Sequence, residues 1–317
     1  MTPTRGQRSP SRSRGAALIA ALTTVALATM LATQLISAQG EAIENLIGRR
    51  DLAQARWLAR GAADWARAIL SEDARTSQID HLGEPWAIKV PPIPIKSGQS
   101  QDIAEGELSG EIAELDGRFN LNRLIPTGTT NQTQVDVFIR LLVSLGTSAG
   151  DANRLAQAVA DWVDGDTLTR DGADELAVYG VPFDNQPLLG VGALPRIPGF
   201  TPALVARLQP FVSALPQRLP LNVNTAPAEV LAAELPALGL ATAQRVVAER
   251  ERAPFRDVAD FNARFIGAGA GASCGVSSKF FLVTTRSSYG ESVVQLRTLL
   301  YRNARGKWPD ILWQQTL

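Results

Sequence analysis

The sequence predicts an α+β fold, in which a long N-terminal helix lies against a small antiparallel sheet that is interrupted by a large all-helical insert. Three observations support it. Good helix formers run without proline from Ala16 to about residue 75. Runs typical of strands occur near residues 86–90, 107–116 and 279–302. Helix-like segments separated by Gly and Pro fill residues 119–266.

The first element is a predicted membrane-spanning helix over residues 16–38. Four arginines and no acidic residue precede Gly15, and the 25 residues from Ala16 to Gly40 carry no formal charge. An apolar helix needs about 20 residues to cross a bilayer, and basic residues on one flank hold that flank in the cytoplasm. A cleaved signal peptide is the alternative, but the apolar run exceeds the roughly 7–15 residues of a signal h-region.

The helix pattern continues beyond the apolar segment to about residue 75. Apolar residues recur at helical spacing while arginines and acidic residues fill the other faces, as at Leu46, Ala53, Trp57, Trp65 and Ile69. The outer half of the helix is therefore predicted to be amphipathic and to pack on one side.

A short basic leader (1–15) that ends in Gly15, an immediate apolar helix and an amphipathic continuation resemble a type IV prepilin-like N-terminus. The resemblance implies cleavage by prepilin peptidase between Gly15 and Ala16, N-methylation of Ala16 and retention of the helix. The fifth residue after the cut is usually Glu in this family, and here it is Ala20. Among pseudopilins, the K-type minor pseudopilin of the type II secretion system is the one that lacks this glutamate, so the sequence resembles that type.

Two separated parts are predicted to form a pilin-like β-domain. The first, residues 76–118, holds the strands near 86–90 and 107–116, with the proline-rich run 91–98 as an extended connection. The second, residues 267–317, holds a hairpin over 279–302. Ile311-Leu312-Trp313 is expected to add an edge strand or to tuck under the long helix.

The insert between them is predicted to contain two related helical units, over residues 119–216 and 217–266. The run Phe119-Asn120-Leu121-Asn122 returns in altered form as Leu221-Asn222-Val223-Asn224, and each copy leads into two helical segments. The units resemble the sterile-alpha-motif-like inserts that K-type pseudopilins carry in their pilin domain.

The second unit also resembles a helix-hairpin-helix, the DNA-gripping module of a secreted or anchored periplasmic DNA-uptake protein. Residues 219–265 hold five arginines, no lysine and six acidic residues, whereas phosphate binding requires a net basic face. The hairpin Leu238-Gly239-Leu240 lacks paired glycines. A packing or protein-interaction role is therefore favoured, and no nucleic-acid partner is expected.

Residues 161–175 hold six carboxylates and one arginine. Oxygen-only ligands on a glycine-containing loop suit Ca²⁺, while zinc would require the His or Cys that this segment lacks. The segment is not an EF-hand loop, because Thr169 stands where glycine is required. From spacing alone, a structural calcium site and a solvated acidic loop both remain open.

The same segment resembles the acidic signature of K-type pseudopilins, whose helical domain binds calcium. The matching residues are Asp161-Trp162-Val163-Asp164-Gly165-Asp166, then Gly172-Ala173-Asp174-Glu175 and Tyr179. The resemblance implies that Asp164, Asp166, Asp174 and Glu175 are Ca²⁺ ligands and that Asp171 is a weaker candidate. Asp161 is expected to face the helix.

No catalytic residues are predicted. The single Cys274 and single His81 nearly exclude Cys/His nucleophilic pairs. A hydrolase that uses paired carboxylates would need a cleft for which the sequence gives no indication. A general type IV pilus minor pilin would share the leader but would carry the glutamate that Ala20 replaces.

The family resemblance therefore implies a non-enzymatic minor pseudopilin of the inner membrane, with its C-terminal domain in the periplasm. Its implied partners are the I- and J-type minor pseudopilins, through them the major pseudopilin, and prepilin peptidase. Together the minor pseudopilins would form the tip and initiation complex of the periplasmic pseudopilus.

Overall fold

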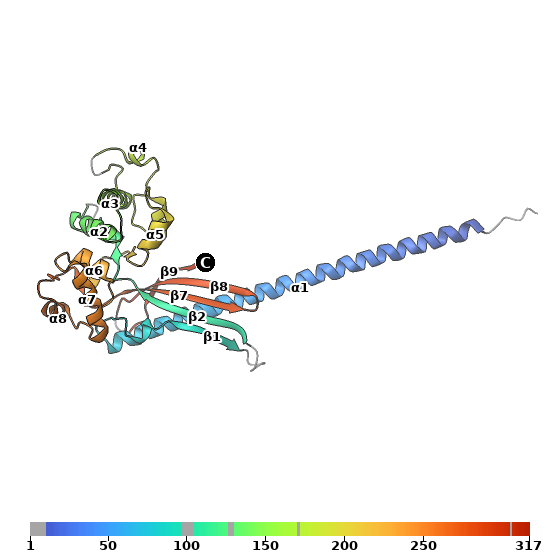
Figure 1. The fold of residues 1–317 in the computed structure, drawn as a ribbon. Coiled ribbons are helices and arrows are strands. Elements are labelled where there is room, and N and C mark those ends of the chain that lie inside the picture. The colour runs from blue at the N-terminus through green and yellow to red at the C-terminus, as the bar shows by residue number, and fades with distance from the viewer. Residues whose placement is uncertain (1–10, 97–103, 126–129, 170–171, 305) are drawn as a thin grey trace, which may run out of the picture.

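The computed structural model describes residues 11–96, 104–125, 130–169, 172–304 and 306–317. A single long helix, α1 (Ser11–Thr76), projects from a head in which a sheet lies along the C-terminal part of α1 (Figure 1). The helical insert lies beyond the sheet, at the end of the molecule farthest from the start of α1.

Helix α1 confirms the predicted long helix. Its 66 residues contain no proline, and every described residue from Gly15 to Arg50 is exposed. By length and composition, this stretch is long and apolar enough to cross a membrane, since its most apolar window has a mean hydropathy of 2.0.

The sheet has five antiparallel strands in the order β1-β2-β7-β8-β9. They are β1 (Val90–Lys96), β2 (Ala104–Glu114), β7 (Phe280–Tyr289), β8 (Ser292–Tyr301) and β9 (Asp310–Thr316). Strands β2 and β7 pair from Gly106↔Tyr289 to Glu114↔Phe281. The insert therefore leaves and rejoins the sheet between neighbouring strands. Strand β9 pairs with β8 as an edge strand, which is the first of the two predicted placements.

The predicted strand at residues 86–90 is wrong. Residues Pro85–Ala87 form a short 3-10 turn that buries Trp86 against Phe281. The strand is β1, and it runs through the proline-rich segment that was expected to be only a connection. Proline is tolerated there because an edge strand needs no N–H donors on its outer side, and the pairing with β2 shifts register between Val90 and Ile93.

Small side chains allow α1 to lie close to the sheet. Ala55, Ala59 and Ala63 are buried on one face of the helix against β8 residues. Two hydroxyls of β7 reach helix carbonyls, since Ser287 Oγ donates to Ala55 O at 2.6 Å and Thr285 Oγ1 donates to Ala59 O at 3.2 Å. These bonds fix the position of the helix along the sheet.

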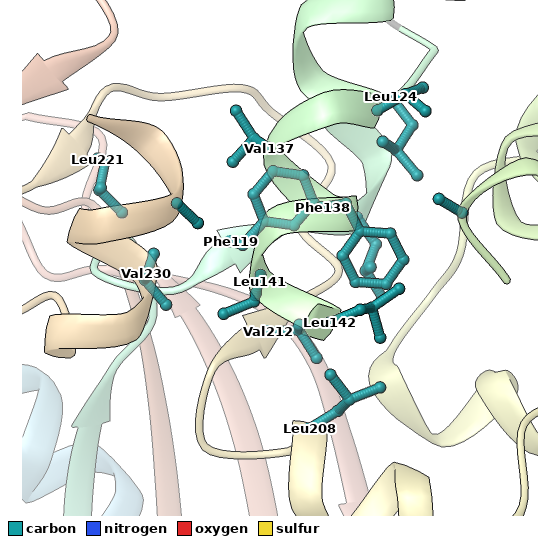
Figure 2. Close-up of a cluster of buried hydrophobic side chains, with 14 of the residues drawn as sticks. Phe119, Leu124, Val137, Phe138, Leu141, Leu142, Leu208, Val212, Leu221 and Val230 are labelled. Atoms are coloured by element: carbon teal, nitrogen blue, oxygen red, sulfur yellow. The ribbon is translucent and has the colours of Figure 1, made fainter. Parts of the chain in front are cut away.

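The described residues of the insert form seven α-helices around one hydrophobic core. They are α2 (Gln132–Ser144), α3 (Ala149–Val163), α4 (Glu175–Tyr179), α5 (Pro202–Leu208), α6 (Ala228–Glu234), α7 (Gly239–Arg252) and α8 (Val258–Arg264). Figure 2 shows Phe119 and Phe138 of the first unit near Leu221 and Val230 of the second. The rings of Phe119 and Phe138 stack with centroids 5.4 Å apart. The two units therefore share a continuous core.

The repeated asparagines make the same turn in both units. Asn120 Oδ1 accepts the N–H of Asn122, and Asn222 Oδ1 accepts the N–H of Asn224. Each copy of the repeated run also contains a two-residue strand that pairs in parallel with a second short strand, and the sequence did not predict these pairs. The pairs are β3 (Phe119–Asn120) with β4 (Val212–Ser213), and β5 (Leu221–Asn222) with β6 (Cys274–Gly275).

Candidate functional site

The predicted processing site lies at the exposed start of α1. Gly15, Ala16 and Ala20 are all exposed, and a Cβ at Gly15 would meet no atom within 4 Å. The Ala20 carbonyl accepts the hydroxyls of Thr23 and Thr24 at 2.9 and 2.8 Å. These hydroxyls are thus satisfied within the helix, which suits an apolar surrounding. Residues 1–10 of the leader lie outside the described residues.

A cluster of carboxylates lies just past the end of α3. One carboxylate oxygen from each of Asp164, Asp166 and Glu175 lies within 4.8 Å of the other two. Asp164 is the C-cap residue of α3. The C-terminal end of a helix carries a partial negative charge, so it disfavours carboxylates that have no cation.

The loop between α3 and α4 folds back so that Glu175 returns to Asp164. Leu168 and Asp174 form a β-bridge, and the Glu175 N–H donates to the Thr167 carbonyl at 3.1 Å. Asp174 Oδ1 caps α4 by accepting the N–H of Ala177 at 2.9 Å. The cap starts a five-residue helix that holds Glu175 in its first turn.

The electrostatics of the cluster favour a bound cation. Burial, followed by the charges of Asp166 and Asp161, raises the pKa of Asp164 to about 7. Burial, followed by the charge of Asp164, raises the pKa of Glu175 to about 7. Asp164 Oδ1 and Glu175 Oε1 are buried and have no hydrogen-bond partner among the described residues. Such groups are costly in the interior unless a cation or donor meets them.

The donor set fits calcium. Three carboxylates on an irregular loop, two of which have a buried oxygen without a hydrogen-bond partner among the described residues, match the oxygen ligands and flexible geometry of Ca²⁺. The cluster contains no His or Cys, so it does not fit zinc. Asp164, Asp166 and Glu175 are the residues that would hold the ion, which would neutralise their mutual repulsion.

The structure thus brings three of the five candidate ligands together. Asp174 is exposed and its carboxylate caps α4. Asp171 lies outside the described residues. Asp161 is buried within α3, and its Oδ2 accepts the hydroxyl of Tyr179 at 2.6 Å.

Asn185, from the segment that follows α4, also contacts the cluster. Its Nδ2 donates to the Asp166 carbonyl, and its Oδ1 is buried without a hydrogen-bond partner among the described residues. Its backbone is in the left-handed region, with φ of 49°. Asn tolerates that region better than most residues, so the conformation is a reason for an Asn at this position.

A second acidic group, Asp73, Asp80 and Glu84, already contains its own cation. Arg302 Nη1 lies 2.9 Å from Asp73 Oδ2, and Arg302 Nη2 donates to both oxygens of Asp80. Glu84 accepts the indole N–H of Trp86 at 2.7 Å. This group is therefore a structural ion-pair network, and the sequence pattern did not predict it.

A membrane-length apolar helix whose outer half packs on a small antiparallel sheet defines a pilin-like subunit. Family models described as "Type II secretion system (T2SS), protein K" match residues 117–217 and 221–277. Protein K of Pseudomonas aeruginosa is 33% identical over 308 residues, covering 92% of this chain and 90% of the relative. Protein K of Klebsiella pneumoniae is 32% identical over 314 residues, covering 93% and 94%. The chain belongs to the type II secretion system protein K family, and it is a minor pseudopilin.

A solved structure has the same fold. The GspK-GspI-GspJ complex of the enterotoxigenic Escherichia coli type 2 secretion system contains a chain that matches with a TM-score of 0.72. The match has 24% identity and covers 86% of this chain and 99% of the other.

The DNA-uptake alternative is not supported. Besides the family assignment, Arg250 of the second unit is buried and donates to the carbonyls of Val223, Thr225 and Ala226. It is therefore committed to the fold and does not face a phosphate.

Proposed function

We propose that this minor pseudopilin is the tip subunit that initiates the periplasmic pseudopilus, and that it is not an enzyme. The observation that carries the proposal is the position of the helical insert, at the end of the molecule opposite the start of α1 (Figure 1). The insert would obstruct the head of any subunit that was stacked above this one in the filament. The bulk of the insert therefore favours the terminal position in a helical filament.

Ala20 supports the same position. In the pilin-like pattern, a glutamate there pairs with the N-terminal amine of a neighbouring subunit. An unpaired charge in hydrocarbon is costly, and Ala20 offers the amine no carboxylate. A subunit with alanine here is poorly suited to accept another subunit above it.

The proposed partners are the I- and J-type minor pseudopilins, and through them the major pseudopilin. The E. coli chain with the same fold was solved together with GspI and GspJ, which supports this assignment. In the precursor, the arginine-rich leader lies in the cytoplasm and the head lies in the periplasm. Prepilin peptidase then cuts between Gly15 and Ala16 and the new N-terminus is methylated.

We also propose that Asp164, Asp166 and Glu175 hold a structural Ca²⁺. The unpaired buried oxygens of Asp164 and Glu175 support it, because each carboxylate otherwise lacks a partner. The ion would join the end of α3 to the start of α4.

The Ala20→Glu variant tests the position at the tip. A gold-labelled antibody against this protein locates it on pseudopili in the electron microscope. The expected result is label along the shaft, whereas the wild type is labelled only at the tip. Ala21→Glu is the matched control, because it places the same carboxylate about 100° around the helix. Tip-only label for Ala20→Glu would contradict the role given to Ala20 and leave the insert as the sole cause.

The processing is tested by sequencing the N-terminus of the mature protein by mass spectrometry. A methylated Ala16 is expected. A mature chain that starts at Gln39 would overturn the prepilin assignment, because it would mean that a signal peptidase had removed the helix.

A further inference from the structure

The two edges of the sheet differ in how open they are to another strand. The outer edge of β1 carries Pro91, Pro92 and Pro94, which cannot donate to a further strand. Strand β9 contains no proline, and Asp310 at its start is its only charged residue. No described strand pairs with the outer side of β9.

The register of β9 identifies which backbone groups face outward. The N–H of Leu317 donates to the carbonyl of Gln295 on β8. Because inward and outward residues alternate in an antiparallel pair, Gln314 and Thr316 direct their N–H and C=O groups away from β8. An edge with such unpaired groups is a template for another strand.

A basic groove lies beside this edge. It has a volume of about 330 Å³ and lies between α1 and the sheet, lined by Arg56 and Arg60 of α1 and by Gln314 and Thr316 of β9. No acidic residue lines it, and neither arginine has a carboxylate within 4.0 Å among the described residues. The two arginines are four residues apart on one helix face, so they repel each other unless an anion lies between them.

A lipid headgroup is a poor candidate for that anion. Arg56 lies 18 residues beyond residue 38, where the predicted membrane segment ends. At ~1.5 Å per helical residue, this separation is about 27 Å. A protein carboxylate is the anion that fits the neighbouring open strand.

We propose that the outer edge of β9 docks an extended segment of a neighbouring pseudopilin, which pairs with Gln314 and Thr316 and places an acidic side chain between Arg56 and Arg60. The main-chain bonds supply affinity and the arginines select a segment with a carboxylate at the right position. This inference rests on the proposed function, because the neighbouring chain is another subunit of the tip complex.

The test uses the full chain in detergent, alone and mixed with the I- and J-type pseudopilins of the same secretion system. Amide hydrogen exchange is followed at Gln314 and Thr316. The expected result is slower exchange of both amides in the complex than in the isolated chain. A complex in which both amides exchange at the isolated rate would overturn the inference while leaving the proposed function intact.

Two substitutions at one position separate the backbone from the side chain. Gln314→Pro removes the outward N–H without removing a backbone hydrogen bond to β8, and is expected to weaken the complex roughly tenfold or more. Gln314→Ala is the matched control, because it loses the same bond to Thr298 Oγ1 but keeps the N–H. Equal affinities for the two variants would contradict strand pairing. Circular dichroism and thermal unfolding verify that both variants are folded.

Charge reversal tests the groove. Arg56→Glu with Arg60→Glu is expected to weaken the complex roughly tenfold or more, since it places like charges opposite the acidic segment. Arg207→Glu, an exposed arginine on α5, is the control and should have no effect. No loss on reversing Arg56 and Arg60 would overturn the acidic partner.

Self-association of the chain through β9 would give a different result. Slower exchange at Gln314 and Thr316 that depends on the concentration of the isolated chain would mean that two copies pair through β9, and would overturn the assignment to another pseudopilin. Failure of the wild-type chain to bind the I- and J-type subunits at all would overturn the proposed function, and this inference with it.

Discussion

Arg302 Nη1 lies 2.9 Å from Asp73 Oδ2 and so ties the end of β8 to the last turn of α1. The same guanidinium donates to Asp80 and to the carbonyl of Ser278, and it lies over the ring of Phe281. The side chain of Arg302 is only 10% exposed. One buried cation therefore joins the long helix, the sheet and the segment that returns from the insert.

Replacing Arg302 by Met is expected to lower the free energy of unfolding by about 3–5 kcal/mol, because Asp73 and Asp80 are left buried without their cation. Urea unfolding followed by circular dichroism measures it. Lys89→Met is the control, since it breaks the Lys89–Glu111 pair, whose side chains are 78% and 48% exposed. That change should cost about 0–1 kcal/mol. Equal losses for the two variants would contradict the structural role of Arg302.

The long helix and three of the sheet strands were predictable because each shows its own local periodicity. An unbroken run of helix formers predicts α1, and the alternating pattern of residues 107–116 predicts most of β2. Strand β1 was misplaced because proline content argues against a strand unless its position at a sheet edge is known. That position follows from pairing with β2 and is a tertiary property.

The acidic site was predictable in composition but not in geometry. The density of carboxylates in residues 161–175 indicated the site, and the structure places Asp164 and Asp166 just after α3. Nothing in the sequence distinguishes Asp174, which caps α4, from Glu175, which points back to the cluster. The contact of Asn185 with Asp166 depends on a left-handed backbone conformation at Asn185 itself, well beyond the acidic segment. The local pattern does not encode that contact.

Gly117 is expected to tolerate no side chain. It lies between β2 and the first unit of the insert, and a Cβ there would be 2.3 Å from Thr225 Oγ1 and 2.8 Å from Ala226 N. Gly117→Ala should therefore lower the free energy of unfolding by about 1–3 kcal/mol or more. Gly61→Ala is the matched control in the interior of α1, where a Cβ meets nothing within 4 Å. It should stabilise by about 0.5–1 kcal/mol. Thermal unfolding measures both effects: the melting temperature should fall for Gly117→Ala and rise for Gly61→Ala.

The buried pair Glu114 and Asp116 predicts that stability falls as pH rises. Burial, followed by the charge of Glu114, raises the pKa of Asp116 to about 8, although its Oδ2 accepts the N–H groups of Lys279 and Phe280. Burial also raises the pKa of Glu114. An unfolded Asp titrates near 3.9, so between about pH 4 and pH 8 the folded state binds more protons than the unfolded state. The free energy of unfolding then decreases as pH rises.

The measurement is the melting temperature at pH 5.5 and pH 8 for the wild type and Asp116→Asn. The asparagine keeps an acceptor for both N–H groups but does not titrate. The melting temperature of the variant is expected to decrease less between pH 5.5 and pH 8 than that of the wild type. The other charged groups that face Asp116, Glu114 and Asp80, are unchanged in the comparison. An identical pH dependence would contradict a raised pKa at Asp116.

Calcium is expected to stabilise the head through Asp164 and Glu175. At free calcium 100-fold above the Kd, binding to the folded state alone adds about 2.7 kcal/mol to the free energy of unfolding. Asp164→Asn and Glu175→Gln should each abolish most of this gain, because each removes a carboxylate whose buried oxygen has no other partner among the described residues. Asp174→Asn should keep it, since asparagine also caps a helix N-terminus. Isothermal titration of the full chain in detergent measures the Kd, with magnesium as the competing ion. Loss of binding in Asp174→Asn together with retained binding in Asp164→Asn would reverse the ligand assignment, because the cap residue would then be the one that holds the ion.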